Sequence, residues 1–326
     1  MSEIFDLSRQ FIYRSARPLD FARWRFHFEG GPKTDVLEAL AQYQNEDGGF
    51  GHALEPDCWN PFSSPIQTWA ATEILHEIGF HDSAHPLVAG ILKYLGSGKD
   101  FDGHHWYNTV ESNNNFPHAP WWHAGSDSAS HHDYNPTACL AGFILLHAEP
   151  GSALYTLGFD IAGEALSALI SQGTIHDMHT LLCYIRLLQY VQQAAGPAPF
   201  SALALKRKLV EQVSRCISPD KTAWSDSYVC MPSQFIDSRD SIFYASNQEL
   251  ADAQCGHIIR TQLEDGTWPV NWGWADYPDA WAVSKIWWKS AIIIKNILYL
   301  RDVGSSAAGF MPEANPGASR TRERQV

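Results

Sequence analysis

Two carboxylic acids lie close together after a glycine-rich turn in the N-terminal part of the chain. The segment His52–Trp59 reads His-Ala-Leu-Glu-Pro-Asp-Cys-Trp, so Glu55 and Asp57 flank a proline. In a dry aromatic cavity, burial and mutual repulsion favour the protonated form of one acid of such a pair. Such an acid protonates an alkene or an epoxide, so we expect Glu55 or Asp57 to be a general acid, with Trp59 beside the substrate. The alternative is a loop whose acids cap the next helix or bind surface arginines.

A second cluster, rich in aromatic and histidine side chains, spans residues 113–135. Long loops without regular structure inside a compact domain are usually functional. We therefore expect Trp121, Trp122 and His123 to form the wall or lid of a substrate pocket, and the histidines to carry protons near neutral pH. The alternative is an insertion that covers one end of the fold. Adjacent histidines, as at 131–132, rarely point at one ion, so we predict no metal site and no cofactor.

A third cluster of aromatic side chains lies in Trp268–Tyr277. The negative faces of aromatic rings stabilise a carbocation by about 0.5–2 kcal/mol per contact, and the same rings stack on sugars. We expect Trp272 and Trp274 to line a pocket, with Asp276 beside them as a weaker acid candidate. Packing in the core is the alternative for both tryptophans, and it is the preferred interpretation of the tryptophans at 287–288.

The elements that must position these residues are predicted to be helices. Apolar residues recur three or four positions apart along much of the chain, and alternating strand-like runs are few. Thr34 and Pro136 stand where helices are expected to start. The sequence therefore predicts an all-α fold. The predicted helices lie near residues 34–44, 65–79, 85–96, 136–148, 158–171, 177–195, 201–217, 246–261 and 281–301.

Two turns between predicted helices have nearly the same sequence. Gln44–Phe50 and Gln262–Trp268 share Gln, Glu, Asp, Gly and a terminal aromatic residue at identical spacing, and weaker copies occur at Phe101–Trp106 and Asp220–Trp224. Glycine permits a tight turn and aspartate accepts backbone N–H groups there, while glutamine is expected to bridge the turn to a helix end. A period of about 50 residues indicates an array of roughly five or six helical hairpins. We assign the repeated Gln and Asp a structural role.

The pattern Gln-x-x-Asp-Gly-x-aromatic resembles the QW repeat of the terpenoid cyclase and protein prenyltransferase superfamily, which includes squalene–hopene cyclases. The two strong copies lie near opposite ends of the chain, so the resemblance extends over about residues 6–302. It implies a single α/α toroid with a central aromatic cavity, which we place at residues 1–303. The remaining residues, 304–326, are predicted to be a disordered tail.

The acidic signatures of that superfamily do not occur in this sequence. Asp-x-Asp-Asp, the acid motif of the class II cyclases, is missing, and so is the magnesium-binding Asp-Asp-x-x-Asp of the ionising synthases. Asp57 and Cys58 are adjacent and lack the Asp-x-Cys spacing of the zinc-dependent prenyltransferases. The resemblance therefore implies a metal-independent, cyclase-like enzyme in which Glu55 or Asp57 takes the place of the class II acid.

Composition limits the partners and the compartment. Of 326 residues, 45% are hydrophobic and 13% aromatic, and the net charge is −13, so we expect a large core and no nucleic-acid binding. The N-terminus lacks a basic region followed by an apolar run, and three lysines interrupt the apolar stretch Trp281–Leu300. We predict neither a signal peptide nor an integral membrane segment. Six dispersed cysteines indicate free thiols and a cytoplasmic protein.

Three functions agree with these observations. The first is acid-initiated cyclisation or rearrangement of a small apolar isoprenoid, with tryptophans shielding the cation. The second is a carbohydrate-active lyase or hydrolase, because α/α toroids also carry such enzymes; Glu55, Asp57 and Asp276 would then supply acid and base. The third is a binding protein that holds an apolar ligand without turnover.

Overall fold

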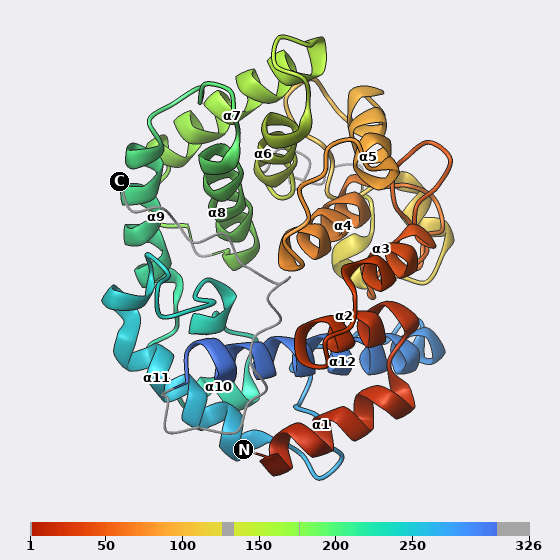
Figure 1. Cartoon of the computed structure of the whole chain (residues 1–326), viewed down its shortest axis with the longest axis vertical. Coiled ribbons are helices and arrows are strands. Elements are labelled where there is room, and N and C mark those ends of the chain that lie inside the picture. The colour runs from red at the N-terminus through yellow and green to blue at the C-terminus, as the bar shows by residue number, and fades with distance from the viewer. Residues whose placement is uncertain (1, 126–133, 176, 305–326) are drawn as a thin grey trace. The chain divides into compact units, whose positions relative to one another are not determined.

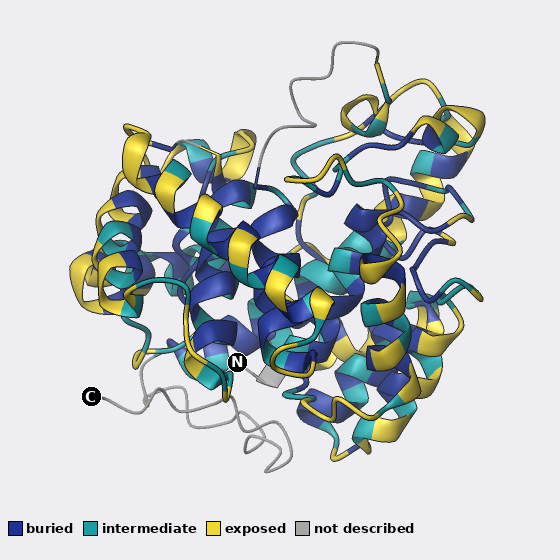
Figure 2. Cartoon of the chain, turned by 90° about the horizontal axis from the view of Figure 1, so that it is seen from above, coloured by how far each residue is buried: buried dark blue, intermediate teal, exposed yellow. Residues whose placement is uncertain are grey.

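The computed structural model describes residues 2–125, 134–175 and 177–304. Within these ranges every regular element is a helix, and extended backbone is limited to isolated bridges (Figure 1). The prediction of an all-α fold is therefore confirmed. Figure 2 shows helices with one buried and one exposed side, which is the pattern of amphipathic helices around a core. The described residues divide into two compact units.

The first unit, unit 1, contains the described residues in 2–42, 77–80 and 217–304. Its long helix α12 contacts α1, α2 and α11, and the buried Ile293, Ile294 and Ile297 belong to this packing. Proline stands at the start of both α2 and α12, where its missing N–H costs nothing. The elements of unit 1 are α1 (Ser2–Ser15), α2 (Pro18–Phe28), α3 (Lys33–Ala41), α10 (Ala223–Asp226), the 3₁₀-helix η4 (Pro232–Gln234), α11 (Tyr244–Thr261) and α12 (Pro278–Asp302).

Charged side chains buried in unit 1 are paired with one another. Asp20 is fully buried and accepts hydrogen bonds from Arg17 at 2.7 Å and from Arg23 at 2.8 Å. Arg23 continues to the carboxylate of Glu77, which also contacts His27 at 2.8 Å. Burial would by itself raise the pKa of Glu77, but Arg23 and His27 outweigh it and lower the pKa of this carboxyl. This chain of charges ties α2 to Glu77 within unit 1.

The second unit, unit 2, contains residues 43–76 and the described residues in 81–216. Its helix α6 packs against α5, α7 and α8 and is buried on nearly all sides, which explains its lack of a polar face (Figure 1). Side-chain caps begin α7 at Ser152 and α8 at Asp177. The helices of unit 2 are α4 (Pro65–Glu77), α5 (Pro86–Gly96), η1 (Glu111–Asn115), η2 (Pro120–Trp122), α6 (Thr137–His147), α7 (Ala153–Ser171), α8 (Met178–Gln193) and α9 (Ala202–Cys216).

Each of the nine predicted helical segments overlaps one observed helix. The sequence analysis did not place α1 and α2, nor the short α10. Thr34 does not cap α3, because that helix begins at Lys33 and its N-cap is Pro32. Pro136 is the N-cap of α6, as expected. Closure of the helices into one ring stays a prediction, and residues 305–326 of the predicted tail lie outside the described residues.

The two repeated turns have the same conformation, one in each unit. Gln44 Nε2 donates to Gly48 O within its turn and to Leu87 O in α5, at 2.9 and 3.0 Å. Gln262 Nε2 likewise donates to Gly266 O in its turn and to Ile4 O in α1, at 3.1 and 3.0 Å. The predicted structural role of both glutamines is confirmed, because each fastens its turn to a helix distant in sequence.

The aspartates of the two turns also play the same part. Asp47 accepts the N–H of Gly49 at 3.0 Å, and Asp265 accepts the N–H of Thr267 at 3.1 Å. Burial opposes ionisation of both acids, but hydrogen bonds and the nearby lysines Lys99 and Lys289 outweigh it and lower both pKa values. The weak copy at Asp220 repeats the bond to the residue two positions later.

One described helix, α7, is long and apolar enough by length and composition to cross a membrane. It packs against α6 and α9, and its residues Ile161, Ala165 and Leu169 are buried. A helix in a protein core passes the same test, so this is weak evidence for a span. The stretch Trp281–Leu300 lies within α12, which does not meet the criterion.

Replacing the glycine of either repeated turn should destabilise the fold. A Cβ at Gly48 would lie 2.1 Å from Gly90 O, and one at Gly266 would lie 2.3 Å from Leu7 O. Both glycines also have positive φ, at 93° and 86°. We expect Gly48→Ala and Gly266→Ala each to lower the free energy of unfolding by about 2–4 kcal/mol, measured by urea denaturation.

Gly98→Ala is the matched control for these substitutions. Gly98 has a φ of 73° but nothing lies within 4 Å of its Cβ position. Gly98→Ala should therefore lower the free energy of unfolding by only about 1 kcal/mol, which is the cost of a left-handed backbone conformation at alanine. Equal losses in all three variants would contradict the close approach of turn and helix.

Candidate functional site

The predicted acids lie in a buried loop of unit 2. Glu55 is 7% exposed and Asp57 is 2% exposed. Glu55 Oε2 accepts the backbone N–H of Asp57 at 2.9 Å, which stabilises a negative charge on Glu55. We call residues 52–60 the acid loop.

Gln67, in the first turn of α4, holds the acid loop in place. Its Oε1 accepts the N–H of Glu55 at 3.1 Å, and its Nε2 donates to Cys58 O and Asn60 O at 3.0 and 3.1 Å. Gln67 is fully buried. The Gln67 side chain thus forms hydrogen bonds with three backbone groups that lie outside any helix or sheet. These bonds fix the position of the acid loop relative to α4.

The acid loop pairs with the segment of the second predicted cluster. Cys58 and His118 form an isolated antiparallel bridge, with Trp59 N–H donating to Pro117 O at 2.9 Å and Ala119 N–H to Asp57 O at 2.8 Å. These bonds flank Cys58 and His118, so the two side chains lie close together on one face. Two clusters that were separate in the sequence therefore form one region, which we call the acid-loop site.

Asn113 of η1 fastens the two segments from the other side. Its Oδ1 accepts the Cys58 thiol at 3.3 Å and Asn60 Nδ2 at 2.9 Å, and its Nδ2 donates to Trp122 O at 2.9 Å. Asn113 is fully buried. The acid-loop site is therefore held by buried hydrogen bonds on both sides.

His118 and His123 form a hydrogen-bonded, stacked pair. His118 Nε2 and His123 Nδ1 are 3.1 Å apart, and their rings stack with centroids separated by 5.4 Å. His118 Nδ1 contacts Phe116 O at 2.7 Å, and a carbonyl only accepts, so this nitrogen carries a proton. In the neutral pair His118 Nε2 then accepts from His123. His118 is buried and His123 is exposed, so the pair connects solvent to the acid-loop site.

The tryptophans predicted for this region differ in their burial. Trp121 is 45% exposed, whereas Trp59 and Trp122 are half-buried. The indole Nε1 of Trp122 is buried without a hydrogen-bond partner among the described residues. A buried unsatisfied donor costs about 1–3 kcal/mol, which a bound acceptor would recover. Trp122 is therefore the tryptophan best suited to contact a ligand with an oxygen acceptor.

The backbone before the acids adopts an uncommon conformation. His52 and Ala53 have φ values of 59° and 58°, although neither is glycine. Consecutive left-handed residues of this kind cost about 1–3 kcal/mol each and cluster at functional sites.

Cys58 is protonated at physiological pH. Burial raises the pKa of its thiol to about 12, and the charges of Glu55 and Asp57 act in the same direction. A neutral buried thiol is neither a nucleophile nor a metal ligand. Its part in the site is the hydrogen bond to Asn113.

The third predicted cluster lies in unit 1 and is mostly packed. Trp274 is 5% exposed and contacts Trp281 and Tyr277. Trp272 is half-buried against Trp288, and Asp276 is exposed. The predicted binding roles of Trp272, Trp274 and Asp276 stay predictions, and Trp272 is the better placed of the two tryptophans to meet a ligand.

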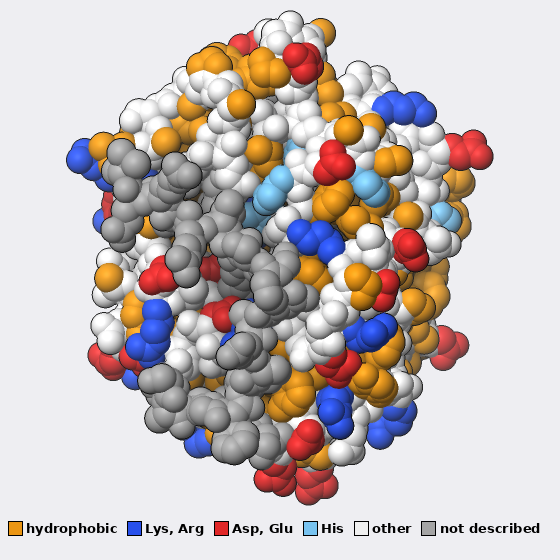
Figure 3. Space-filling model, in the orientation of Figure 1, with side chains coloured by type: hydrophobic (Ala, Val, Ile, Leu, Met, Phe, Trp, Pro, Cys, Tyr) orange, Lys and Arg blue, Asp and Glu red, His pale blue; other side chains and the backbone are white. Residues whose placement is uncertain are grey.

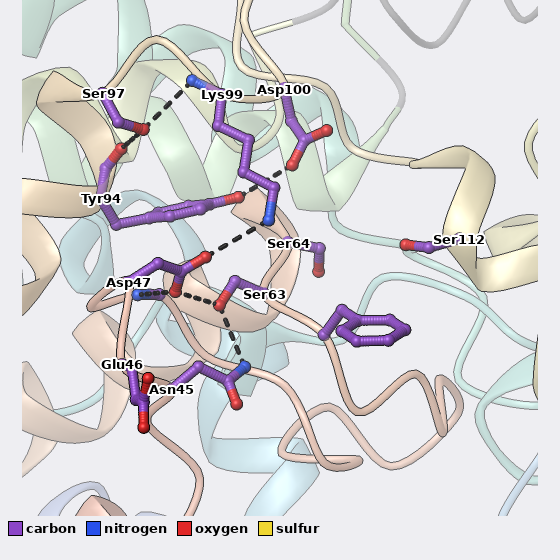
Figure 4. Close-up of polar contacts among 12 residues, drawn as sticks. Asn45, Glu46, Asp47, Ser63, Ser64, Tyr94, Ser97, Lys99, Asp100 and Ser112 are labelled. Carbon is purple, nitrogen blue, oxygen red and sulfur yellow. Dashed lines mark hydrogen bonds and ion pairs between the residues drawn. The ribbon is translucent and has the colours of Figure 1, made fainter.

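A surface hollow of about 300 Å³ lies at the first repeated turn (Figure 4). Both Ser63 and Lys99 reach the Asp47 carboxylate, at 2.6 and 3.3 Å, and Asn45 donates to Ser63 at 3.0 Å. Because these polar groups already hydrogen-bond one another, we interpret the hollow as a result of the shape of the turn and not as a ligand site. It is lined by Asn45, Glu46, Asp47, Phe62, Ser63 and Lys99.

Within the described part of the chain, neither a basic patch nor a metal-binding cluster indicates a further site. On the face drawn in Figure 3, Lys and Arg are interspersed with Asp and Glu among the coloured residues, without an extended basic patch. No group of three or more His, Cys, Asp or Glu side chains within the described ranges could hold a metal ion. The histidines and aspartate at 131–133 lie outside those ranges.

Comparison of the chain with family models, with curated proteins and with solved structures finds no match. The function must therefore be argued from the acid-loop site. Two residues that build it, Gln67 and Asn113, were given no role in the sequence analysis. Gln67 carried a signal, because it lies among Ile66, Ala71 and Leu75 on the apolar side of α4. A polar residue on such a face must find partners.

Replacing Gln67 should loosen the acid loop. Gln67→Leu leaves one buried N–H and two buried carbonyls without this partner. We expect the free energy of unfolding to fall by about 2–4 kcal/mol in urea denaturation. Gln10→Leu, at an exposed position of α1, is the control and should change stability by less than about 0.5 kcal/mol. Similar small effects at both positions would show that Gln67 does not anchor the loop.

Cys58 should make stability depend on alkaline pH. Its folded pKa is about 12 against an ordinary value of 9.0, so between these limits only the unfolded thiol loses its proton. The stability that Cys58 contributes is present below pH 9 and is lost as pH rises towards 12. Cys58→Ser keeps a donor to Asn113 but does not titrate. Above pH 9 the unfolding free energy of Cys58→Ser should fall less steeply with pH than that of the unsubstituted protein. The difference between the two slopes should be about 1.4 kcal/mol per pH unit. An unchanged slope would contradict burial of the thiol.

Proposed function

We propose that the chain is an enzyme that protonates a small apolar, isoprenoid-type substrate and directs its cyclisation or rearrangement, with the acid loop as the proton source. The observation that carries this proposal is the burial of both Glu55 and Asp57 in one rigid loop. Water-poor surroundings favour the neutral, protonated form of a carboxylic acid, so such an acid keeps a proton that it can transfer to a bound substrate.

The two acids receive different roles. The N–H of Asp57 stabilises a negative charge on Glu55, and a second charge two residues away is unfavourable. We therefore assign the transferable proton to Asp57 and an electrostatic role to Glu55, whose charge stabilises the cation that forms. His118 and His123 return the proton from solvent after turnover.

The aromatic residues support an apolar substrate with one oxygen. Trp59 and Trp122 are half-buried aromatic residues of this site whose rings could stabilise a cation, and the buried Trp122 Nε1 matches an acceptor such as an epoxide or alcohol oxygen. The repeated Gln-Asp-Gly turns, with their shared hydrogen bonds, support the resemblance to the terpenoid cyclase superfamily. The resemblance suggests the substrate class.

The proposal is tested with purified protein, squalene, oxidosqualene and shorter prenyl alcohols. We expect cyclised hydrocarbons or alcohols, detected by gas chromatography and mass spectrometry. Asp57→Asn should lower the rate by about 10²–10⁴-fold, which is the usual contribution of a general acid. Glu55→Gln should also lower the rate, because it removes the stabilising charge.

Glu111→Gln is the matched control, because Glu111 is an exposed acid of η1 beside the same site. It should leave the rate unchanged. Unaltered products and rates in Asp57→Asn would remove the acid assignment. Thermal stabilisation by a prenyl compound without turnover would favour a binding protein, and turnover of an oligosaccharide would favour the carbohydrate-active alternative.

A further inference from the structure

Two helices of unit 2 reach solvent along a single stripe each. Their other residues in this part are buried, and the half-buried ones recur three or four positions apart. The half-buried residues are Trp69, Ala70 and Glu73 within residues 65–75 of α4, and Leu182, Arg186 and Gln189 within residues 181–191 of α8. This spacing places each set on one face of its helix. A ligand can therefore meet these two helices along these stripes.

The two stripes meet at a charged pair. Glu73 accepts hydrogen bonds from Arg186 Nε at 2.8 Å and from Arg186 Nη2 at 2.6 Å. The side chains of Glu73 and Arg186 are 19% and 12% exposed, so solvent reaches part of the pair. On the inner side, the fully buried thiol of Cys139 in α6 donates to Glu73 Oε1 at 3.5 Å. We call Trp69, Glu73, Arg186 and Gln189 the α4–α8 site.

Stability alone does not account for a charged pair in this position. Replacing an ion pair inside a protein by apolar side chains of similar size is often neutral or stabilising, because desolvation offsets the attraction between the charges. The sequence neighbours Ile74 on α4 and Ile185 and Leu187 on α8 are buried apolar residues, so apolar side chains suit these surroundings. We therefore interpret the pair as part of a binding site.

Trp69 lies next to this pair and has an unused hydrogen-bond donor. It precedes Glu73 by four residues, and side chains four apart on a helix are neighbours. Long helical side chains lean towards the N-terminus, so Glu73 leans towards Trp69. Trp69 Nε1 is buried and has no hydrogen-bond partner among the described residues. A buried donor without an acceptor is costly, and an oxygen of a ligand bound at the pair would satisfy it.

The hydrogen-bonding groups that remain at this site define the ligand. An arginine side chain has five N–H groups. Arg186 binds Glu73 through Nε and Nη2 and Gln189 Oε1 through Nη1, which leaves one N–H on each Nη without a partner in the described ranges. A carboxylate has about four acceptor positions, and Glu73 keeps one beyond those used by Arg186 and Cys139. Because the charges of the pair cancel, the site matches a neutral ligand with several oxygen acceptors and a hydroxyl donor.

We propose that the α4–α8 site binds a neutral sugar through adjacent hydroxyl groups, held by Glu73, Arg186 and Trp69. A hydroxyl group both donates and accepts. One sugar hydroxyl donates to Glu73 and accepts from Arg186, and its neighbour accepts from Arg186 and from Trp69 Nε1. This binding does not depend on the function proposed for the acid loop. Gln67, which holds that loop, lies two residues before Trp69 and therefore on another side of α4.

The test measures binding of glucose, galactose, mannose, maltose and cellobiose to the full chain. Saturation-transfer difference NMR detects binding, and titration gives the dissociation constants. We expect at least one of these sugars to bind with a Kd in the millimolar range or tighter. Glucose 6-phosphate carries most of the hydroxyl groups of glucose together with negative charge, so it should bind no more tightly than glucose. Binding of none of these sugars, or tighter binding of the phosphate, would overturn the assigned ligand class.

Variants connect the binding to these residues. Glu73→Leu combined with Arg186→Met replaces the pair by apolar side chains and leaves no charge unpaired, so this double variant should fold, as circular dichroism will check. It should weaken sugar binding at least about tenfold. The matched control is Glu211→Leu with Arg215→Met, which removes an exposed pair on α9 and should leave sugar binding unchanged. Trp69→Phe removes only the indole N–H from the hydrogen bonds and should weaken binding about threefold to tenfold.

Trp69→Phe decides the outcome if the double variant does not fold. Sugar binding at full strength in Trp69→Phe and in a folded double variant would overturn the site. Loss of sugar binding in Asp57→Asn, with full binding in the double variant, would place the sugar at the acid loop and would also overturn it. Turnover of prenyl compounds tests the acid loop separately, so each of the two proposals can fail alone.

Discussion

Buried side-chain amides supply the backbone hydrogen bonds on which the irregular parts of this protein depend. Gln67 serves the acid loop, Gln212 serves the connection before α8 through Ile175 N–H and Gly173 O, and Gln254 receives Ser233 N–H. All three are fully buried. An amide offers both a donor and an acceptor, so one side chain can satisfy loop groups of either kind without burying a charge. Long loops therefore lie inside the fold at little electrostatic cost.

The same constraint explains why the acid-loop site is both polar and stiff. Its carboxylates need a fixed backbone, and that backbone has positive φ at two successive residues, which only strong external bonding maintains. Gln67 and Asn113 supply that bonding from opposite sides, and the short bridge between Cys58 and His118 closes the gap between them. A loop held in this way needs little reorganisation, which is what the proposed proton transfer would require.

Much of this architecture was predictable from periodicity and turn chemistry. Helices such as α8 are predictable because their apolar residues recur three and four positions apart. The Gln-Asp-Gly turns are predictable because glycine permits a tight turn and aspartate accepts backbone N–H groups there. Helix α2 was missed because Arg23, Arg25 and His27 interrupt its pattern, and their pairing with distant groups such as Glu77 has no local signal. For the same reason the sequence indicated Glu55 and Asp57 as chemical candidates but not Asn113 as their support. Long-range hydrogen bonds leave little trace in spacing.

The hydrogen bond from Gln262 of the second repeated turn to Ile4 of α1 joins residues that are 258 positions apart. During synthesis the N-terminal helices therefore emerge long before α11 and α12, their partners in unit 1, exist. Unit 2 is contiguous in the chain apart from a short excursion and has its partners to hand much earlier. The faces of α1 and α2 that pack against α12 therefore stay uncovered until this last helix has left the exit tunnel, whereas α2 can pack against α1 and α3 much earlier.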